Sequence, residues 1–274
     1  MSILLTLSVR SLQKLMSPRP RPGGGGGSGA GLSVHDVPAF AIKELQLHGL
    51  NVPASLLAGW SMSDLDRLRD RADKASCPCL VLIEDHPLPF GSKDERQRVE
   101  AKDRVKRLGT AAHRLGCNAI AVQCGSADSP EAFALAAEDL RSAMSSLDRF
   151  QLNLLLAPHE GLTHHPDRLA DLIKKIGGFR IGALADFGHA HATHDLVGAL
   201  RKLAPYSGSI HATVRGFTKT GAHKEFDLAA AVNTVQEVGF VNTLAIDYTG
   251  NGDPVATIVK ARAILQQALE VEPE

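Results

Sequence analysis

The chain has 274 residues, with 30 basic and 30 acidic side chains and a formal net charge of zero. That balance argues against a basic nucleic-acid-binding surface, and the 4% aromatic content argues against stacking platforms for single-stranded nucleic acid. No stretch approaches the roughly 20 apolar residues that span a bilayer, so we expect no membrane association. The four cysteines are too few for a disulfide framework in a chain of this length, and we expect reduced thiols in a cytoplasmic protein.

The N-terminal region is basic and rich in glycine. Residues 1–35 contain four basic residues and no acidic one. Such a start is typical of some targeting peptides, but here the apolar stretch is short and the basic residues follow it. We therefore expect a first strand at about 3–9 and then a flexible Gly/Pro-rich loop at about 17–31. That loop lacks the GK[ST] ending of a phosphate-binding loop, so we assign it no ligand.

Beyond residue 31, short apolar runs alternate with amphipathic segments. The expected strands are 79–83, 118–122, 152–156, 180–185, 209–214 and 243–246, with a weaker apolar piece at 47–52. The expected helices are 63–74, 93–115, 130–147, 166–176, 195–203, 226–238 and 254–269. Ser63 and Ser129 are the expected N-caps of two of these helices, and Pro130 suits a first helical position.

This alternation predicts the fold. Strand–helix repetition about eight times over roughly 250 residues is typical of a parallel sheet, and a (β/α)8 TIM barrel is the expected architecture. An open doubly wound sheet is the alternative. No GxGxxG motif follows an expected strand, which disfavours a dinucleotide-binding version of that alternative. No internal linker interrupts the pattern, so we expect residues 1–274 to form one domain.

In such a barrel the chemistry lies at the carboxyl ends of the strands. Asp186, His211 and Asp247 come from three consecutive expected strands, so their side chains would converge at one mouth. Two carboxylates and an imidazole suit a divalent metal such as Mn, Mg, Co or Zn, which would stabilise an enediolate. Each residue alone is better explained as a loop cap, whereas the three together favour a ligand site. Other polar residues at strand ends are Glu84, Asp85, His86, Gln123, His159, Glu160, His189 and Tyr248.

Four segments carry a family resemblance: ALADFGHA (183–190), SIHATVRG (209–216), EVGFVNTLAIDYTG (237–250) and the GDP tripeptide (252–254). Through them, the chain from about residue 153 to 269 resembles the xylose isomerase-like barrel superfamily. That group contains sugar and sugar-phosphate isomerases and epimerases, and endonuclease IV. The N-terminal half is similar in its layout of a charged helix followed by an apolar strand.

The resemblance implies that Asp186, His211 and Asp247 bind the metal, and that His189 contacts the substrate. It also implies a fourth ligand, a Glu that closes the fifth strand. In this chain the corresponding residue is Ala157, which can neither bind a metal nor remove a proton. The strand-eight acid, usually Glu in the family, is the shorter Asp247.

The first hypothesis is therefore a metal-assisted sugar or sugar-phosphate isomerase or epimerase, with Asp247 and His189 as its catalytic residues. His159 and Glu160 are candidates to replace the missing carboxylate or to contact the substrate, and Arg215 is a further substrate contact. The alternative is a catalytically impaired relative that binds a sugar-like ligand or a protein partner. An endonuclease of abasic DNA is disfavoured by the neutral charge and the missing Glu. The sequence leaves open whether the protein forms a homo-oligomer.

Overall fold

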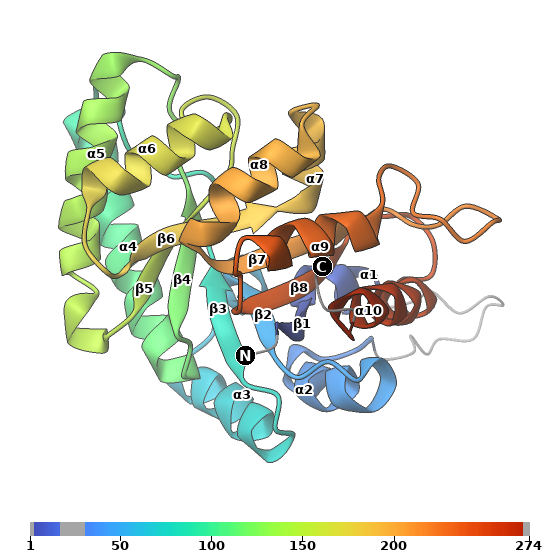
Figure 1. The fold of residues 1–274 in the computed structure, drawn as a ribbon. Helices are drawn as coiled ribbons and strands as arrows, with labels where there is room; N and C mark the ends of the chain where they lie inside the picture. Colours follow the sequence, from blue (N-terminus) through green and yellow to red (C-terminus); the bar gives the residue numbers. More distant parts are fainter. Residues whose placement is uncertain (1–2, 17–30, 271–274) are drawn as a thin grey trace, which may run out of the picture.

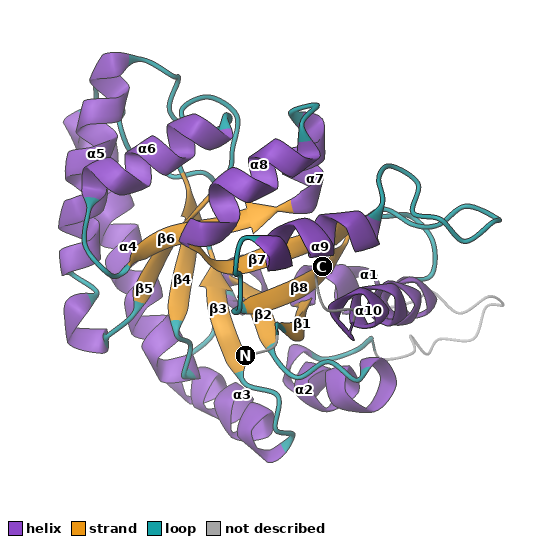
Figure 2. Cartoon of the chain, viewed as in Figure 1, coloured by secondary structure: helices purple, strands orange, loops and turns teal. Residues whose placement is uncertain are grey.

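Eight parallel strands close into a barrel in sequence order, and helices surround it (Figures 1 and 2). The computed structural model describes residues 3–16 and 31–270. The strands are β1 (Leu4–Ser8), β2 (Leu50–Pro53), β3 (Cys79–Ile83), β4 (Ala119–Gln123), β5 (Asn153–Ala157), β6 (Ile181–Asp186), β7 (Ser207–Val214) and β8 (Thr243–Tyr248). Pairing of β8 with β1 closes the ring, so the predicted (β/α)8 fold is confirmed.

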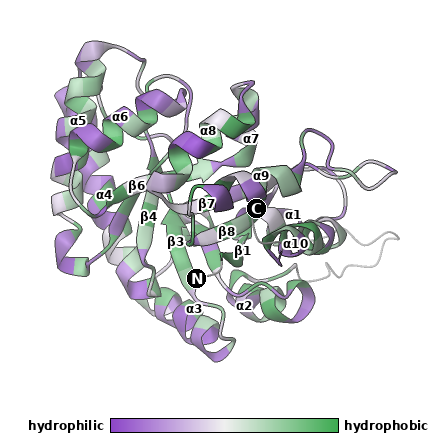
Figure 3. Ribbon diagram, viewed as in Figure 1, coloured by the Kyte–Doolittle hydropathy of each residue, from purple (hydrophilic) through white to green (hydrophobic). Residues whose placement is uncertain are grey.

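The longer helices pack around the outside of the strands. They are α3 (Met62–Lys74), α4 (Glu95–Leu115), α5 (Pro130–Ser145), α6 (Pro166–Ile176), α8 (Leu196–Leu203), α9 (Leu228–Glu237) and α10 (Pro254–Glu270). The shorter helical segments are η1 (Val9–Leu12), α1 (Gln13–Met16), η2 (Val34–Asp36), α2 (Val37–Phe40), η3 (Ala41–Leu45), η4 (Ala54–Leu57), η5 (Asp148–Phe150), α7 (Phe187–Ala192) and η6 (Ala204–Tyr206). Figure 3 shows strands that are mostly hydrophobic and helices that mix both characters, as outer helices with one buried face require. Within the described residues, no helix has the length and apolar character needed to cross a bilayer.

The predicted helix ends differ from the observed ones because of capping. Helix α3 is capped by Ser61, and not by the predicted Ser63. Ser61 and Asp64 form a capping box, in which each side chain accepts from the backbone N–H of the other residue. The predicted cap of α5 is confirmed, because Ser129 Oγ accepts from the Ala132 N–H at 3.1 Å. Helices α4, α8 and α9 begin one or two residues later than predicted, since an Asp caps each of them.

The structure tests the predicted N-terminal strands but not the predicted loop between them. The strand expected at about 3–9 is β1, and the weak apolar piece at 47–52 overlaps β2. The predicted Gly/Pro-rich loop at 17–31 lies outside the described residues, apart from Gly31.

The barrel interior has an apolar side and a polar side. The apolar side belongs to β3–β6 and comprises Val81, Ala119, Ala121, Leu155, Ala157 and Leu184. The polar side includes Asn51 on β2 and Ser209 on β7, whose Nδ2 and Oγ atoms lie 3.3 Å apart. Because β2 and β7 are not neighbours in the ring, this contact crosses the interior. The polar residues of the interior therefore lie beneath the part of the barrel mouth that β7, β8 and β1 form.

Candidate active site

A cavity of about 220 Å³ opens at the mouth of the barrel, on the side where the strands end. This is the end at which barrel enzymes place their chemistry. Its lining residues are Ser8, Arg10, Pro53, Ile83, Asp85, Gln123, Ala157, Pro158, Leu184, Asp186, His189 and His211. Asp247 is buried and adjoins this cavity through its ion pair with Arg10.

The structure brings the three predicted metal ligands together. Asp186, His211 and Asp247 each offer a ligand atom, and these atoms lie within 4.8 Å of one another. Strand register explains this convergence. Asp186 on β6 is paired with His211 on β7, and two residues along β7, Thr213 is paired with Asp247 on β8.

The donor set fits a divalent ion. Ligand atoms bound at about 2.0–2.2 Å to one ion at tetrahedral angles lie about 3.3–3.6 Å apart, so the most widely spaced pair would have to approach by up to roughly 1.3 Å. A ligand imidazole must be neutral, and burial lowers the pKa of His211, which favours the neutral ring. Two carboxylates and an imidazole would hold such an ion with positions open for a substrate.

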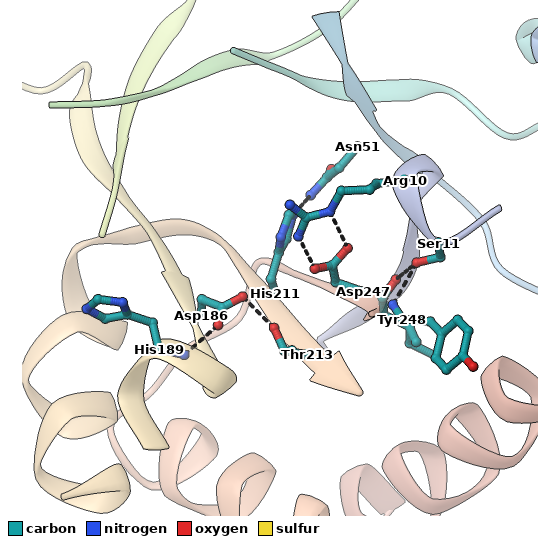
Figure 4. Close-up of polar contacts among 10 residues, drawn as sticks. Arg10, Ser11, Asn51, Asp186, His189, His211, Thr213, Asp247 and Tyr248 are labelled. Carbon is teal, nitrogen blue, oxygen red and sulfur yellow. Dashed lines mark hydrogen bonds and ion pairs between the residues drawn. The ribbon is translucent and has the colours of Figure 1, made fainter. Parts of the chain in front are cut away.

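A tight turn from β6 into α7 fixes Asp186. The carboxylate caps α7, because Oδ1 accepts from the His189 N–H at 2.7 Å. Its other oxygen accepts from the Thr213 hydroxyl at 2.5 Å, and each oxygen keeps a lone pair for a ligand bond (Figure 4). A Cβ added at Gly188 would lie 2.9 Å from Thr213 Cγ2, so this close approach of α7 to β7 needs glycine. The Asp-x-x-His spacing therefore has two effects: Asp186 caps α7, and His189 is placed at the cavity.

His211 is oriented by Asn51. The ring Nε2 lies 3.2 Å from the Asn51 amide Nδ2, and the Asn51 Oδ1 is buried without a hydrogen-bond partner. Rotation of the amide by half a turn would place Oδ1 where it accepts from an Nε2–H group. In that arrangement Nδ1 of His211 carries the lone pair for a ligand bond, and Asn51 sets the tautomer.

Arg10 binds the third carboxylate in a bidentate manner. Its Nε donates to Asp247 Oδ1 at 3.3 Å, and its Nη2 donates to Oδ2 (Figure 4). The Asp247 side chain is 0% exposed, whereas that of Arg10 is 50% exposed. Burial alone would raise the pKa of Asp247, but the positive charges of His211 and Arg10 and the hydrogen bonds from Arg10 and Ser8 outweigh it and hold that pKa below its usual range. Asp247 is therefore a carboxylate throughout the neutral pH range.

Sequence reasoning missed Arg10, which it treated as one of several basic residues near the N-terminus. Arg10 belongs to η1, directly after β1. Ser11 ties η1 to β8, because its Oγ accepts from the Tyr248 N–H at 2.7 Å and donates to the Ile246 carbonyl at 3.3 Å. Since β1 and β8 are neighbours in the barrel, this anchor places Arg10 beside Asp247. Inspection of the residues that follow the first strand would have found it.

His189 lines the cavity, as expected for a residue that contacts substrate. Its Nε2 lies 2.8 Å from the carbonyl oxygen of His164. A carbonyl can only accept, so Nε2 carries the proton and Nδ1 carries the lone pair. His189 is therefore a candidate proton acceptor at the cavity.

The other predicted substrate contacts lie apart from the cavity lining. His159 is half-buried and Glu160 is exposed. Arg215 is 60% exposed, with its Nε 3.4 Å from a carboxylate oxygen of Glu225. None of these three predicted residues lines the cavity.

Ala157 lines the cavity, so the end of β5 offers a methyl group where the family resemblance implies a carboxylate. A different carboxylate is present after β3, two strands away in the ring. Asp85 follows β3 and lines the same cavity, and its Oδ2 accepts from the Ser55 N–H at 2.8 Å. Its neighbour Glu84 is instead buried in an ion pair with Arg104 and does not line the cavity.

Comparison with known proteins supports the same fold. A family model described as xylose isomerase-like TIM barrel matches residues 41–270. No curated protein sequence matches the chain. Among solved structures, L-ribulose 3-epimerase is 15% identical, with 98% of this chain and 95% of that chain covered and a TM-score of 0.80.

Two further structures are similar over nearly their whole length. The 3-keto-D-glucoside 4-epimerase YcjR from E. coli, in its apo form, is 14% identical, with 97% and 99% of the two chains covered and a TM-score of 0.73. The IOLI protein with a binding zinc atom is 13% identical, with 98% and 96% covered and a TM-score of 0.70. At these identities the likeness shows the fold, and the structural neighbours include sugar epimerases.

Proposed function

Because the chain belongs to the xylose isomerase-like TIM barrel family, we propose that it is a divalent-metal-assisted isomerase or epimerase of a small sugar or sugar phosphate. The observation that carries this proposal is the convergence of Asp186, His211 and Asp247 within 4.8 Å, beside a cavity of about 220 Å³. When bound, a divalent ion such as Mn, Mg, Co or Zn supplies polarisation of a carbonyl oxygen and stabilises negative charge on it.

In this proposal Asp186, His211 and Asp247 hold the ion, so Asp247 acts as a ligand and not as a base. Its pKa is lowered, and a carboxylate of low pKa is a weak proton acceptor. His189 moves the proton, because its Nδ1 lone pair is left available by the bond from Nε2 to the His164 carbonyl.

Ala157 limits the mechanism. A methyl group cannot exchange a proton, so a pair of carboxylates on β5 and β8 is not available for a substrate carbon between them. His189 would then remove and return the proton itself, which suits transfer between adjacent carbons. Asp85 is a second proton-transfer group that lines the same cavity.

A second candidate function is a ligand-binding relative without catalysis. Two observations favour it: Ala157 in place of a carboxylate, and the engagement of both Asp247 oxygens by Arg10. This candidate predicts weak metal uptake and no proton exchange on any sugar.

Solvent-deuterium exchange tests the proposal. The protein is loaded in turn with Mn2+, Mg2+, Co2+ or Zn2+ and incubated in D2O with a panel of ketoses, aldoses and their phosphates, and NMR follows the C–H groups beside each carbonyl. We expect metal-dependent exchange with at least one sugar. The matched control is Asp186→Asn, which keeps a helix-capping side chain but removes a charged ligand. Absence of exchange with every metal and sugar contradicts the proposal and favours the second candidate.

A further inference from the structure

We propose that Arg10 is a positioning residue that competes with the divalent ion for Asp247, so that metal binding requires the guanidinium to release this carboxylate. The inference rests on the proposed function, because it concerns the same set of ligands. It adds that the chain itself supplies a cation, the Arg10 guanidinium, at the proposed metal site.

Arg10 occupies both carboxylate oxygens of Asp247. Both of its oxygens accept hydrogen bonds from Arg10, one from Nε and one from Nη2. One of those oxygens must also serve as the ligand atom that Asp247 offers beside Asp186 and His211. A divalent ion bound there would lie close to the guanidinium, and two like charges on one buried carboxylate repel each other strongly.

Asp247 needs a cation as its partner. Its side chain is 0% exposed, and a buried carboxylate without a partner strongly destabilises a fold. Arg10 supplies that partner in this structure. A bound ion would supply it instead, so the two cations are alternatives for one group.

The Arg10 side chain is able to leave Asp247. Its backbone is fixed, because Val9 and Leu12 of η1 are buried and Ser11 is bonded to β8. Its side chain is half exposed and lines a second cavity of about 280 Å³ as well as the first. A side-chain rotation is therefore enough to free Asp247.

The test compares the metal-free wild-type chain with Arg10→Met and Arg10→Lys. Isothermal titration with Mn2+ gives the dissociation constant, and thermal unfolding with and without saturating Mn2+ gives the stability. We expect Arg10→Met to unfold at a lower temperature without metal and yet to bind Mn2+ at least about tenfold more tightly. Added Mn2+ should then raise its unfolding temperature more than it raises that of the wild type.

The opposite directions of these two effects are the signature of competition. A residue with a purely structural role would lower the stability and leave metal affinity unchanged or weaker. Arg10→Lys keeps a charge without the bidentate fork, so its Mn2+ affinity should lie between those of the wild type and Arg10→Met. It also serves as the folded variant if Arg10→Met does not fold without metal.

Lys14→Met is the matched control. Lys14 is a nearby cation whose Nζ bonds the Gly250 carbonyl at 2.8 Å and the Asn251 Oδ1 at 3.3 Å. Its removal tests for a general effect of positive charge, and we expect no change in Mn2+ affinity.

The outcomes separate the two proposals. If the wild type binds Mn2+ and neither Arg10 variant binds it more tightly, the competition is refuted while the proposed function stands. If Lys14→Met tightens Mn2+ binding as much as Arg10→Met does, the effect is general electrostatics and the specific role of Arg10 is refuted. If neither the wild type nor the variants bind any divalent ion, the proposed function fails and this inference fails with it.

Discussion

Asp186 on β6 and His211 on β7 are direct partners in the parallel sheet, so the backbone ladder itself sets the spacing between their side chains. The third member, Asp247, is held by the same register one strand further along. Side chains positioned by strands are held more rigidly than side chains on loops, which is what a preorganised ligand set requires. Substitution of these residues should therefore change metal affinity with little change in the fold.

The first prediction concerns Asp186→Asn. Asparagine also caps helices, so α7 should keep its start, whereas loss of the charge should weaken Mn2+ binding by about 10- to 100-fold. Calorimetric titration measures the affinity, and circular dichroism checks the fold. Equal Mn2+ affinity in the two proteins would place the ion elsewhere.

The second prediction concerns Ala157→Glu. Ala157 lines the cavity, so a longer side chain there would add a charged ligand beside the other three. We expect Mn2+ affinity to rise by about tenfold or more, the size of the loss that typically follows removal of a supporting residue from a metal site. Ala157→Gln is the control, because it has nearly the same shape without the charge. Equal affinities for the Glu and Gln variants would show that position 157 does not face the ion.

The third prediction concerns His189→Gln. The glutamine Nε2 can still donate to the His164 carbonyl, and the backbone N–H that caps onto Asp186 is unchanged. Because the Nδ1 lone pair is lost, deuterium exchange into substrate should fall by about 10²- to 10⁴-fold, with Mn2+ affinity unaltered. Exchange at the wild-type rate would assign the proton transfer to another group, and Asp85→Asn would then be the next variant.

The fourth prediction concerns Gly188→Ala. The added methyl group would lie 2.9 Å from Thr213 Cγ2, closer than two carbon atoms can pack. We expect a loss of about 1–3 kcal/mol in the free energy of unfolding, measured with urea. Gly252→Ala is the control, because the nearest atom to its new methyl group would be the Tyr248 hydroxyl at 3.5 Å. A loss of the same size in both variants would show that the contact with Thr213 is not its cause.

The fifth prediction concerns the cysteines, which are all free and buried. Burial raises the pKa of Cys77, Cys79 and Cys124 to about 12, and that of Cys117 well above its usual value. A thiol with this pKa is thiolate in only about one molecule in ten thousand at pH 8, and thiolate is the reactive form. Ellman's reagent should therefore react slowly with the native chain and with all four thiols after unfolding. Rapid reaction of the native chain would contradict this burial.

The sequence was sufficient to predict the site residues that lie at strand ends directly after apolar runs. Asp186 and Asp247 each come directly after such a run, and a polar residue at that point of a parallel strand faces the barrel mouth. Helix α7 was not predicted, because six residues are too few to show a helical period. Ser63 was predicted as the cap of α3 because serine suits that position. Ser61 suits it equally, and its hydrogen bonds with Asp64 make it the cap.

The pairing of Arg10 with Asp247 shows what the sequence could not provide. Its partner Asp247 is 237 residues away, and the pair exists because β1 closes the barrel against β8. The contact between Asn51 and His211 is of the same kind, since it crosses the barrel interior between strands that are not neighbours. Contacts of this kind depend on closure and register, which local patterns of residues do not encode.

A crystal of the protein soaked in Mn2+, measured for anomalous scattering, tests the central claim most directly. The account predicts one strong anomalous peak bonded to Asp186, His211 and Asp247, with the Arg10 guanidinium turned away from Asp247. An absence of any peak at these three side chains, with Arg10 still bound to Asp247 at saturating Mn2+, would contradict it.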